Sequence, residues 1–139
     1  AYLRWVGAQD LGDGHYDAVL PGYGVVRRGI WYTAAANNRF QALAAAAMTE
    51  VIIAVTTECY VGCLSPSRPV LHVHDEELIE VPEEFVHDFD RTYTRLATEA
   101  TARVMPDVPT VWEAEATDRF SKRAKRLVDE RGRLCVWRG

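Results

Sequence analysis

The longest apolar pattern in the chain is an alanine-rich run that begins at Asn37 or Asn38 and ends near Tyr60. Alanine is the strongest helix former, and the run is apolar on most of its circumference, so it predicts a long helix with an asparagine as its N-cap. Glu50 and Glu58 interrupt the run. Two carboxylates favour a buried helix over a membrane span.

Two different patterns precede this helix. Residues 7–24 are rich in Gly and Asp, as in Gly-Asp-Gly at 12–14, and predict a loop. Residues 25–33 hold β-branched and aromatic side chains around Gly29, which predicts a bent strand or hairpin.

A break at residues 65–67 is followed by two alternating segments, residues 69–74 and 77–81, on either side of Asp75 and Glu76. This arrangement predicts a β-hairpin with acidic residues at its turn.

A second helix is predicted from Pro82, which suits a first helical turn, to the residues before Pro106. Apolar residues recur in it at helical spacing and predict a stripe that faces the core. The stripe consists of Phe85, Phe89, Tyr93, Leu96 and Ala100.

The rest of the chain contains only short predicted elements. Residues 110–116 alternate as an edge strand does, and we expect a short basic helix and then an extended tail over residues 132–137. Strands near one another and long helices together predict an α+β fold with an antiparallel sheet.

The distribution of charged residues along the chain is more informative than the net charge. A net charge of −4 on 139 residues argues against a free-standing nucleic-acid binder. Residues 71–99 hold nine acids against two arginines, whereas residues 119–139 hold eight bases against two acids. This separation suits a metal site near a polyanion, although solvated helix faces produce such runs as well.

Cysteine usage indicates the compartment. Cys59, Cys63 and Cys135 cannot form a complete disulfide set, and their spacing is not that of a zinc site. No charged leader precedes an apolar stretch, so a reduced cytoplasm is the expected location.

The predicted turn at His74, Asp75 and Glu76 is the candidate chemical centre. Magnesium prefers carboxylate oxygens and keeps water or phosphate as its other ligands. Acids are also ordinary turn residues, so spacing alone leaves a catalytic and a structural interpretation open.

Two blocks of sequence resemble family A DNA polymerases. Leu-His-Val-His-Asp-Glu-Glu-Leu-Ile-Glu-Val-Pro-Glu-Glu, at residues 71–84, is similar to the third conserved motif of that family. Residues 32–45 resemble the segment in which Asn, three residues and then Gln enter an alanine-rich helix, in the form found in bacteriophage members. Residues 60–70 and the end of the chain are also similar to phage members, so that the resemblance covers about residues 25–138.

This resemblance implies roles for the residues of the turn. Asp75 would be a metal-binding catalytic aspartate, Glu76 an accessory acid, and His74 a neighbour of the primer terminus. The cofactor implied is Mg²⁺, in a two-metal site completed by residues absent from this chain.

The resemblance also implies DNA-binding residues. Gln41 and Asn37 would contact the minor groove of the primer–template, where acceptors are common to all base pairs, and Arg28 would contact DNA as well.

In this interpretation residues 1–24 are a loop-rich lead-in from the fingers region, and residues 25–139 are the C-terminal part of the palm. The hairpin would belong to a palm-type antiparallel sheet packed against long helices. Asp10, Asp13 and Asp17 lack a flanking apolar strand, so no second catalytic aspartate is visible. We therefore expect an inactive isolated chain that needs a missing N-terminal palm and fingers segment, in the same chain or as a split subunit, with primer–template DNA and dNTP as ligands.

The sequence departs from the family pattern in three respects. Ala42 stands where phage members have Gly, Ala46 and Ala47 stand where they have Asp, and Glu77 replaces an apolar residue.

Two other functions remain as alternatives. One is a small metal-dependent hydrolase that uses His72, His74 and Asp75, although alternation would place the two histidines on one face and Asp75 on the other. The other is a non-catalytic polymerase remnant that binds nucleic acid or a protein.

Overall fold

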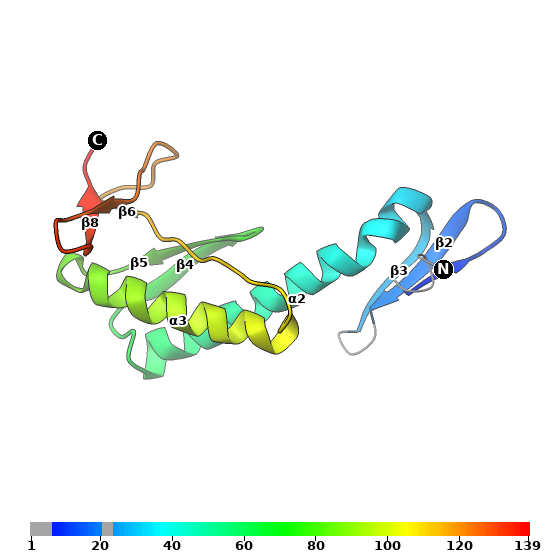
Figure 1. Cartoon of the computed structure of the whole chain (residues 1–139), viewed down its shortest axis with the longest axis horizontal. Helices are drawn as coiled ribbons and strands as arrows, with labels where there is room; N and C mark the ends of the chain where they lie inside the picture. Colours follow the sequence, from blue (N-terminus) through cyan, green and yellow to red (C-terminus); the bar gives the residue numbers. More distant parts are fainter. Residues whose placement is uncertain (1–6, 21–23) are drawn as a thin grey trace. The chain divides into compact units, whose positions relative to one another are not determined.

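The computed structural model describes residues 7–20 and 24–139, and we restrict structural statements to these. The chain divides into two compact units, residues 1–48 and residues 49–139. The boundary lies inside α2 (Tyr32–Val61), the long helix of Figure 1. Each unit is therefore described by itself.

The first unit contains a three-stranded antiparallel sheet in the order β1-β2-β3. Turn residues connect the first two strands: Gly12 and Gly14 have positive φ, and the Asp10 carboxylate accepts a hydrogen bond from the Gly12 N–H. The strands are β1 (Ala8–Asp10), β2 (His15–Leu20) and β3 (Val25–Trp31).

The loop expected over residues 7–24 is therefore wrong in its described part, which contains β1 and β2. The Gly and Asp residues form the turn between two short strands, and their composition masked the strands on either side. β2 pairs with β3 across the expected boundary after residue 24, and the division into a lead-in and a palm segment stays a prediction. Residues 1–6 and 21–23 of the expected lead-in lie outside the described residues.

Helix α2 begins at Tyr32, well before the expected asparagine cap. The cap prediction is wrong because the helix includes the preceding Thr-Ala-Ala-Ala, all compatible with a helix. In the first unit α2 buries Ala35, Asn38 and Ala42. By length and composition α2 is long and apolar enough to cross a membrane, and 28% of its most apolar window is buried. One helix of this kind is weak evidence for a membrane span.

The second unit contains the predicted hairpin and the second helix. The hairpin is confirmed, and the helix follows a single 3-10 turn (Glu83–Phe85) directly after Pro82. The remaining strands are short and lie in the tail. The elements are β4 (Arg68–Val73), β5 (Glu76–Glu80), α3 (Val86–Val104), β6 (Ala116–Thr117), β7 (Leu127–Val128) and β8 (Leu134–Trp137).

The core of the second unit lies between α3 and the last turns of α2, which run side by side in Figure 1. The predicted stripe is confirmed: Phe89, Tyr93 and Ala100 are buried, while Phe85 and Leu96 pack at the edge of the same cluster. From α2 the cluster takes Val51, Val55 and Cys59.

The edge strand expected at residues 110–116 is wrong except for its last residue, which starts β6. Exposure does alternate along this segment, with Val111 84% exposed and Trp112 half-buried. The alternation arises because an extended segment crosses α3 and turns Trp112 onto Tyr93, with ring centroids 6.1 Å apart. One side faces the core as in a strand, but no strand among the described residues pairs with it.

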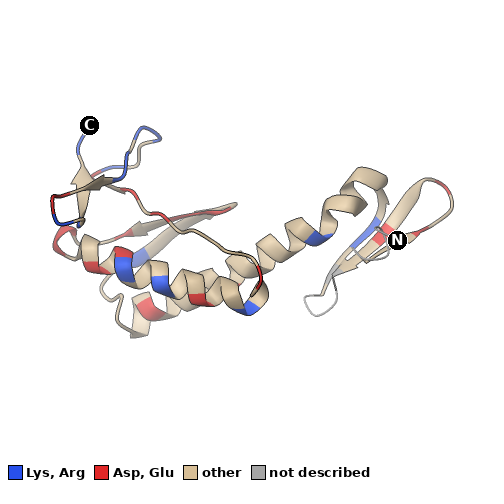
Figure 2. Cartoon of the chain, in the orientation of Figure 1, with Lys and Arg blue, Asp and Glu red and all other residues tan. Residues whose placement is uncertain are grey.

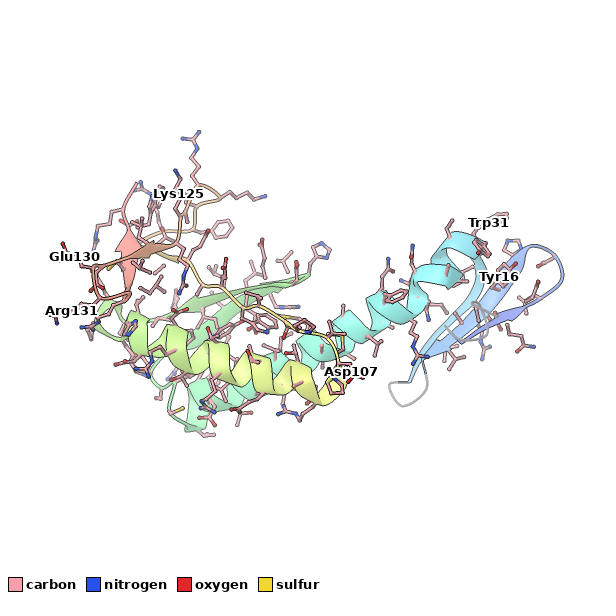
Figure 3. The ribbon with its side chains drawn as sticks, in the orientation of Figure 1. Tyr16, Trp31, Asp107, Lys125, Glu130 and Arg131 are labelled. Atoms are coloured by element: carbon pink, nitrogen blue, oxygen red, sulfur yellow. The ribbon has the colours of Figure 1, made fainter. Side chains whose placement is uncertain are left out.

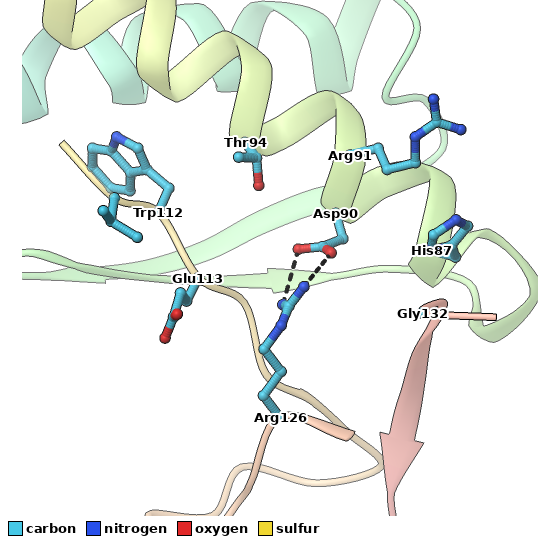
Figure 4. Close-up of a pocket in the computed structure, with 9 residues that line it drawn as sticks. His87, Asp90, Arg91, Thr94, Trp112, Glu113, Arg126 and Gly132 are labelled. Carbon is cyan, nitrogen blue, oxygen red and sulfur yellow. Dashed lines mark hydrogen bonds and ion pairs between the residues drawn. The ribbon is translucent and has the colours of Figure 1, made fainter. Parts of the chain in front are cut away.

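The short basic helix expected after residue 119 does not form. The region consists of turns and β7, which pairs with β8, while β8 pairs with β6 in parallel. Arg126 is held by the buried Asp90 of α3, with Nη1 and Nη2 lying 3.2 and 2.8 Å from the two carboxylate oxygens (Figure 4). The Ala114 carbonyl accepts a further bond from this guanidinium, so Arg126 joins α3, the extended segment and the tail. The extended tail is confirmed as β8.

The α+β class is confirmed, with antiparallel pairing in the sheet of the first unit and in the hairpin. The palm-type arrangement stays a prediction.

Arg126→Ala is expected to lower the free energy of unfolding by about 2 kcal/mol, because it leaves the Asp90 carboxylate buried without its partner. Chemical denaturation measures this loss. The matched control is Arg95→Ala, which removes an exposed pair with Glu99 on the same helix and should cost about 0.5 kcal/mol or less. Equal losses in the two variants would contradict the tethering role of Arg126.

Candidate functional site

The turn of the hairpin consists of His74 and Asp75, because Val73 pairs with Glu76. His74 has a φ of 57°, a left-handed conformation that costs a non-glycine residue about 1–2 kcal/mol. The prediction that His72 and His74 share a face is therefore not supported, since strand alternation ends at Val73.

The side chains of His74, Asp75 and Glu76 are all exposed. Within the described residues none of them takes part in a hydrogen bond or ion pair, so both carboxylates are available to a ligand. One or two free carboxylates fit Mg²⁺, which binds proteins in this way and takes its remaining ligands from water and phosphate.

A complete metal cage is not present in the part of the chain that the structure describes. No group of three His, Cys, Asp or Glu side chains there is placed to hold a metal ion. His72, His74 and Asp75 consequently do not form the ligand set that the hydrolase alternative requires. Asp75 and Glu76 can supply only part of a two-metal site.

The turn is anchored to the core by the strand that follows it. Ile79 and Val81 pack against the core cluster, and the Tyr93 hydroxyl donates a hydrogen bond of 2.9 Å to a Glu77 carboxylate oxygen. Burial raises the pKa of Glu77, and the bond from Tyr93 and the charge of His72 offset this only in part. The pKa of Tyr93 is raised too, by burial and then by Glu77.

This bond accounts for the unexpected charge at position 77. The carboxylate has a partner in α3, so Glu77 ties the hairpin to the helix where an apolar residue would only pack. One signal of it lies in the sequence: Tyr93 is the only member of the predicted apolar stripe with a hydroxyl, and Glu77 stands where the family that the sequence resembles has an apolar residue. We did not predict the pair, because helical spacing places Tyr93 on the core without identifying its partner.

The outer edge of β4 has no strand partner among the described residues, since the sheet contains β4 and β5 alone. The register shifts between Pro69 and Leu71. Three apolar side chains of this strand are about half exposed, namely Val70, Leu71 and Val73. An exposed apolar edge strand is a template for pairing with a further strand.

The expected DNA-binding residues lie in the first unit. Asn37 and Gln41 are one turn apart on the exposed side of α2, and Arg28 is exposed on β3. The Gln41 side-chain oxygen accepts a long bond of 3.4 Å from Arg27. The structure thus groups Asn37 with Gln41, and His74 with Asp75 and Glu76, in separate units.

Comparison of the chain with family models, with characterised proteins and with solved structures finds no match. The polymerase resemblance therefore rests on the residues quoted above.

Glu77→Gln is expected to raise the stability of the protein at neutral pH, because the amide oxygen still accepts the Tyr93 bond while the cost of burying a charge disappears. A raised carboxyl pKa contributes stability that is full below the unfolded value of 4.5 and is lost as pH rises through the folded value. The advantage of Gln over Glu should accordingly vanish when denaturation is repeated at pH 4.

The control is Glu76→Gln, on the exposed neighbour of Glu77, which should change stability by less than about 0.5 kcal/mol at either pH. A Glu77→Gln protein that is less stable than the parent at neutral pH would show that the ionic hydrogen bond outweighs burial.

Proposed function

We propose that this chain is the C-terminal part of the palm of a bacteriophage-type family A DNA polymerase. In this proposal Asp75 is a metal-binding catalytic aspartate for nucleotidyl transfer, Glu76 an accessory acid, and His74 a neighbour of the primer terminus.

The observation that carries the proposal is the combination of motif and geometry at the turn. The His-Asp-Glu sequence stands at the tip of a hairpin, its two carboxylates are exposed without partners among the described residues, and the following strand is fixed to the core through Ile79 and the Tyr93–Glu77 bond. A substrate phosphate can reach carboxylates that are held in this way.

Asp75 and Glu76 are the residues that would hold Mg²⁺. When bound, the ions stabilise charge on the attacking and leaving oxygens of the phosphoryl group. The protein's own contribution is to place the two carboxylates at the end of a short turn whose following strand is anchored to the core, where a phosphate can approach them.

One hairpin cannot supply the whole two-metal site, so the proposal includes a second aspartate on another palm strand. The exposed apolar edge of β4 is suited to receive such a strand. We place this strand in a segment that precedes the chain or in a separate subunit, which also supplies the fingers helix that binds dNTP.

Primer–template DNA is the other proposed partner. Asn37 and Gln41 present amide groups from one exposed side of α2, and such groups pair with minor-groove acceptors. Two of the departures from the family, Ala42 and Ala47, are buried, so they alter packing on the other side of the helix and leave the proposed contact side unchanged. We propose the cytoplasm as the site of activity.

We expect Asp75→Ala to lower the rate of primer extension on the order of 10³-fold, once the chain is joined to or mixed with the proposed preceding segment. A metal ligand stabilises the transition state by several kcal/mol, and about 1.4 kcal/mol corresponds to a factor of ten. Steady-state extension of a labelled primer measures the loss.

Glu80→Ala, which removes an exposed carboxylate from the far end of the same hairpin, is the matched control and should retain the parent rate. Extension by the Asp75→Ala protein at the parent rate would refute the catalytic role of Asp75.

A further inference from the structure

The bases of the C-terminal tail fall into two groups with different surroundings. Figure 2 shows Lys and Arg gathered on the loop before β7 and at the end of the chain. Part of this charge is used within the fold: Arg126 pairs with Asp90, Arg138 pairs with Glu83, and Arg119 donates to the Gly139 carbonyl. These three arginines hold the tail in place.

The remaining basic side chains of this loop form no ion pair or hydrogen bond with the described residues. Lys122, Arg123 and Lys125 lie within residues 120–125, which we call the basic loop, and all three are exposed. No acid within the described residues pairs with any of their side chains. Three positive charges are thus held close together without a partner in the fold.

The basic loop has a defined shape and an exposed aromatic ring. The Ala124 N–H donates to the Ser121 carbonyl, and the Arg123 N–H donates to the Ser121 hydroxyl. Phe120 is 67% exposed, so its ring is accessible to a ligand. The loop therefore presents unpaired cations beside a free aromatic face.

We propose that the basic loop binds the backbone of single-stranded nucleic acid, with Lys122, Arg123 and Lys125 on phosphates and Phe120 stacked on an unpaired base. Clustered cations supply the sequence-independent attraction to phosphates, and an aromatic side chain offers a stacking surface for any base. An anionic membrane fits less well, because interfacial binding relies on a wide apolar face and this loop offers one ring.

This inference does not depend on nucleotidyl transfer. The loop belongs to the tail, whereas the candidate catalytic turn belongs to the β4–β5 hairpin. A chain without polymerase activity would still bind single strands through the loop, and the binding test needs neither Mg²⁺ nor dNTP.

The test is fluorescence anisotropy of a labelled single-stranded 20-nucleotide DNA titrated with the chain over a range of salt concentrations. Replacing Lys122, Arg123 and Lys125 together by Gln should weaken binding about 10- to 100-fold near 0.1 M salt. It should also reduce the slope of log affinity against log salt by about 2, since each phosphate contact on a single strand contributes about 0.7 to that slope. Phe120→Ser alone should weaken binding about 10-fold with little change in slope.

The matched control neutralises three other exposed arginines, Arg91, Arg131 and Arg133, to Gln. Both triple variants change the net charge from −4 to −7, since each removes three positive charges. Figure 3 labels Lys125 on the basic loop and Arg131 on the turn before β8, and Arg91 belongs to α3, so the control residues lie outside the basic loop. The control should bind within about threefold of the parent, and circular dichroism verifies that each variant is folded.

Equal losses in the two triple variants would overturn the proposal, because binding would then follow net charge. Binding of the parent to vesicles with anionic lipid, weakened by the loop substitutions, together with no binding to the oligonucleotide would also overturn it and would assign the loop to a membrane surface.

Discussion

Tyr93 of α3 contacts both the hairpin and the extended segment, and so joins three parts of the second unit. Its hydroxyl donates to Glu77 of the hairpin, its ring stacks on Phe89 at 5.9 Å between centroids, and the edge contact with Trp112 holds the extended segment against α3. A buried hydroxyl needs a partner, and a half-buried carboxylate gains a donor, so each group satisfies the other. This pair ties the hairpin that carries the candidate catalytic turn to α3, whereas the side chains of the turn make no bond of their own within the described residues.

The hairpin and α3 are predictable from the sequence because local signals agree there. Residues 68–80 alternate around a short acidic turn, and the Phe85-to-Ala100 stripe has the spacing of one helix face. The failures have physical causes. The alternation of Val111 and Trp112 comes from an extended segment on a helix, not from a sheet, and the Gly and Asp residues of the turn between β1 and β2 masked both strands.

The residues of the candidate site could be predicted from the sequence, but the contacts that hold the hairpin and the tail in place could not. Asp75 and Glu76 are marked by the motif, whereas the Tyr93–Glu77 bond and the Asp90–Arg126 pair join residues 16 and 36 positions apart. No local pattern specifies such contacts, since each depends on how α3 packs. The same pairings account for part of the charge separation, because several acids and bases fix the hairpin and the tail. The carboxylates of the turn and the cations of the basic loop are among the charges that have no partner in the described residues.

We have proposed that Asp75 belongs to a polymerase palm whose other half is encoded elsewhere. The nucleotide sequence upstream of the codon for Ala1 in the source DNA tests this proposal. We expect the same frame, or an adjacent gene, to encode an apolar strand that ends in an aspartate and a helix that carries Arg, Lys and Tyr. A frame that starts at this chain, with no neighbouring gene for those parts, would refute the proposal.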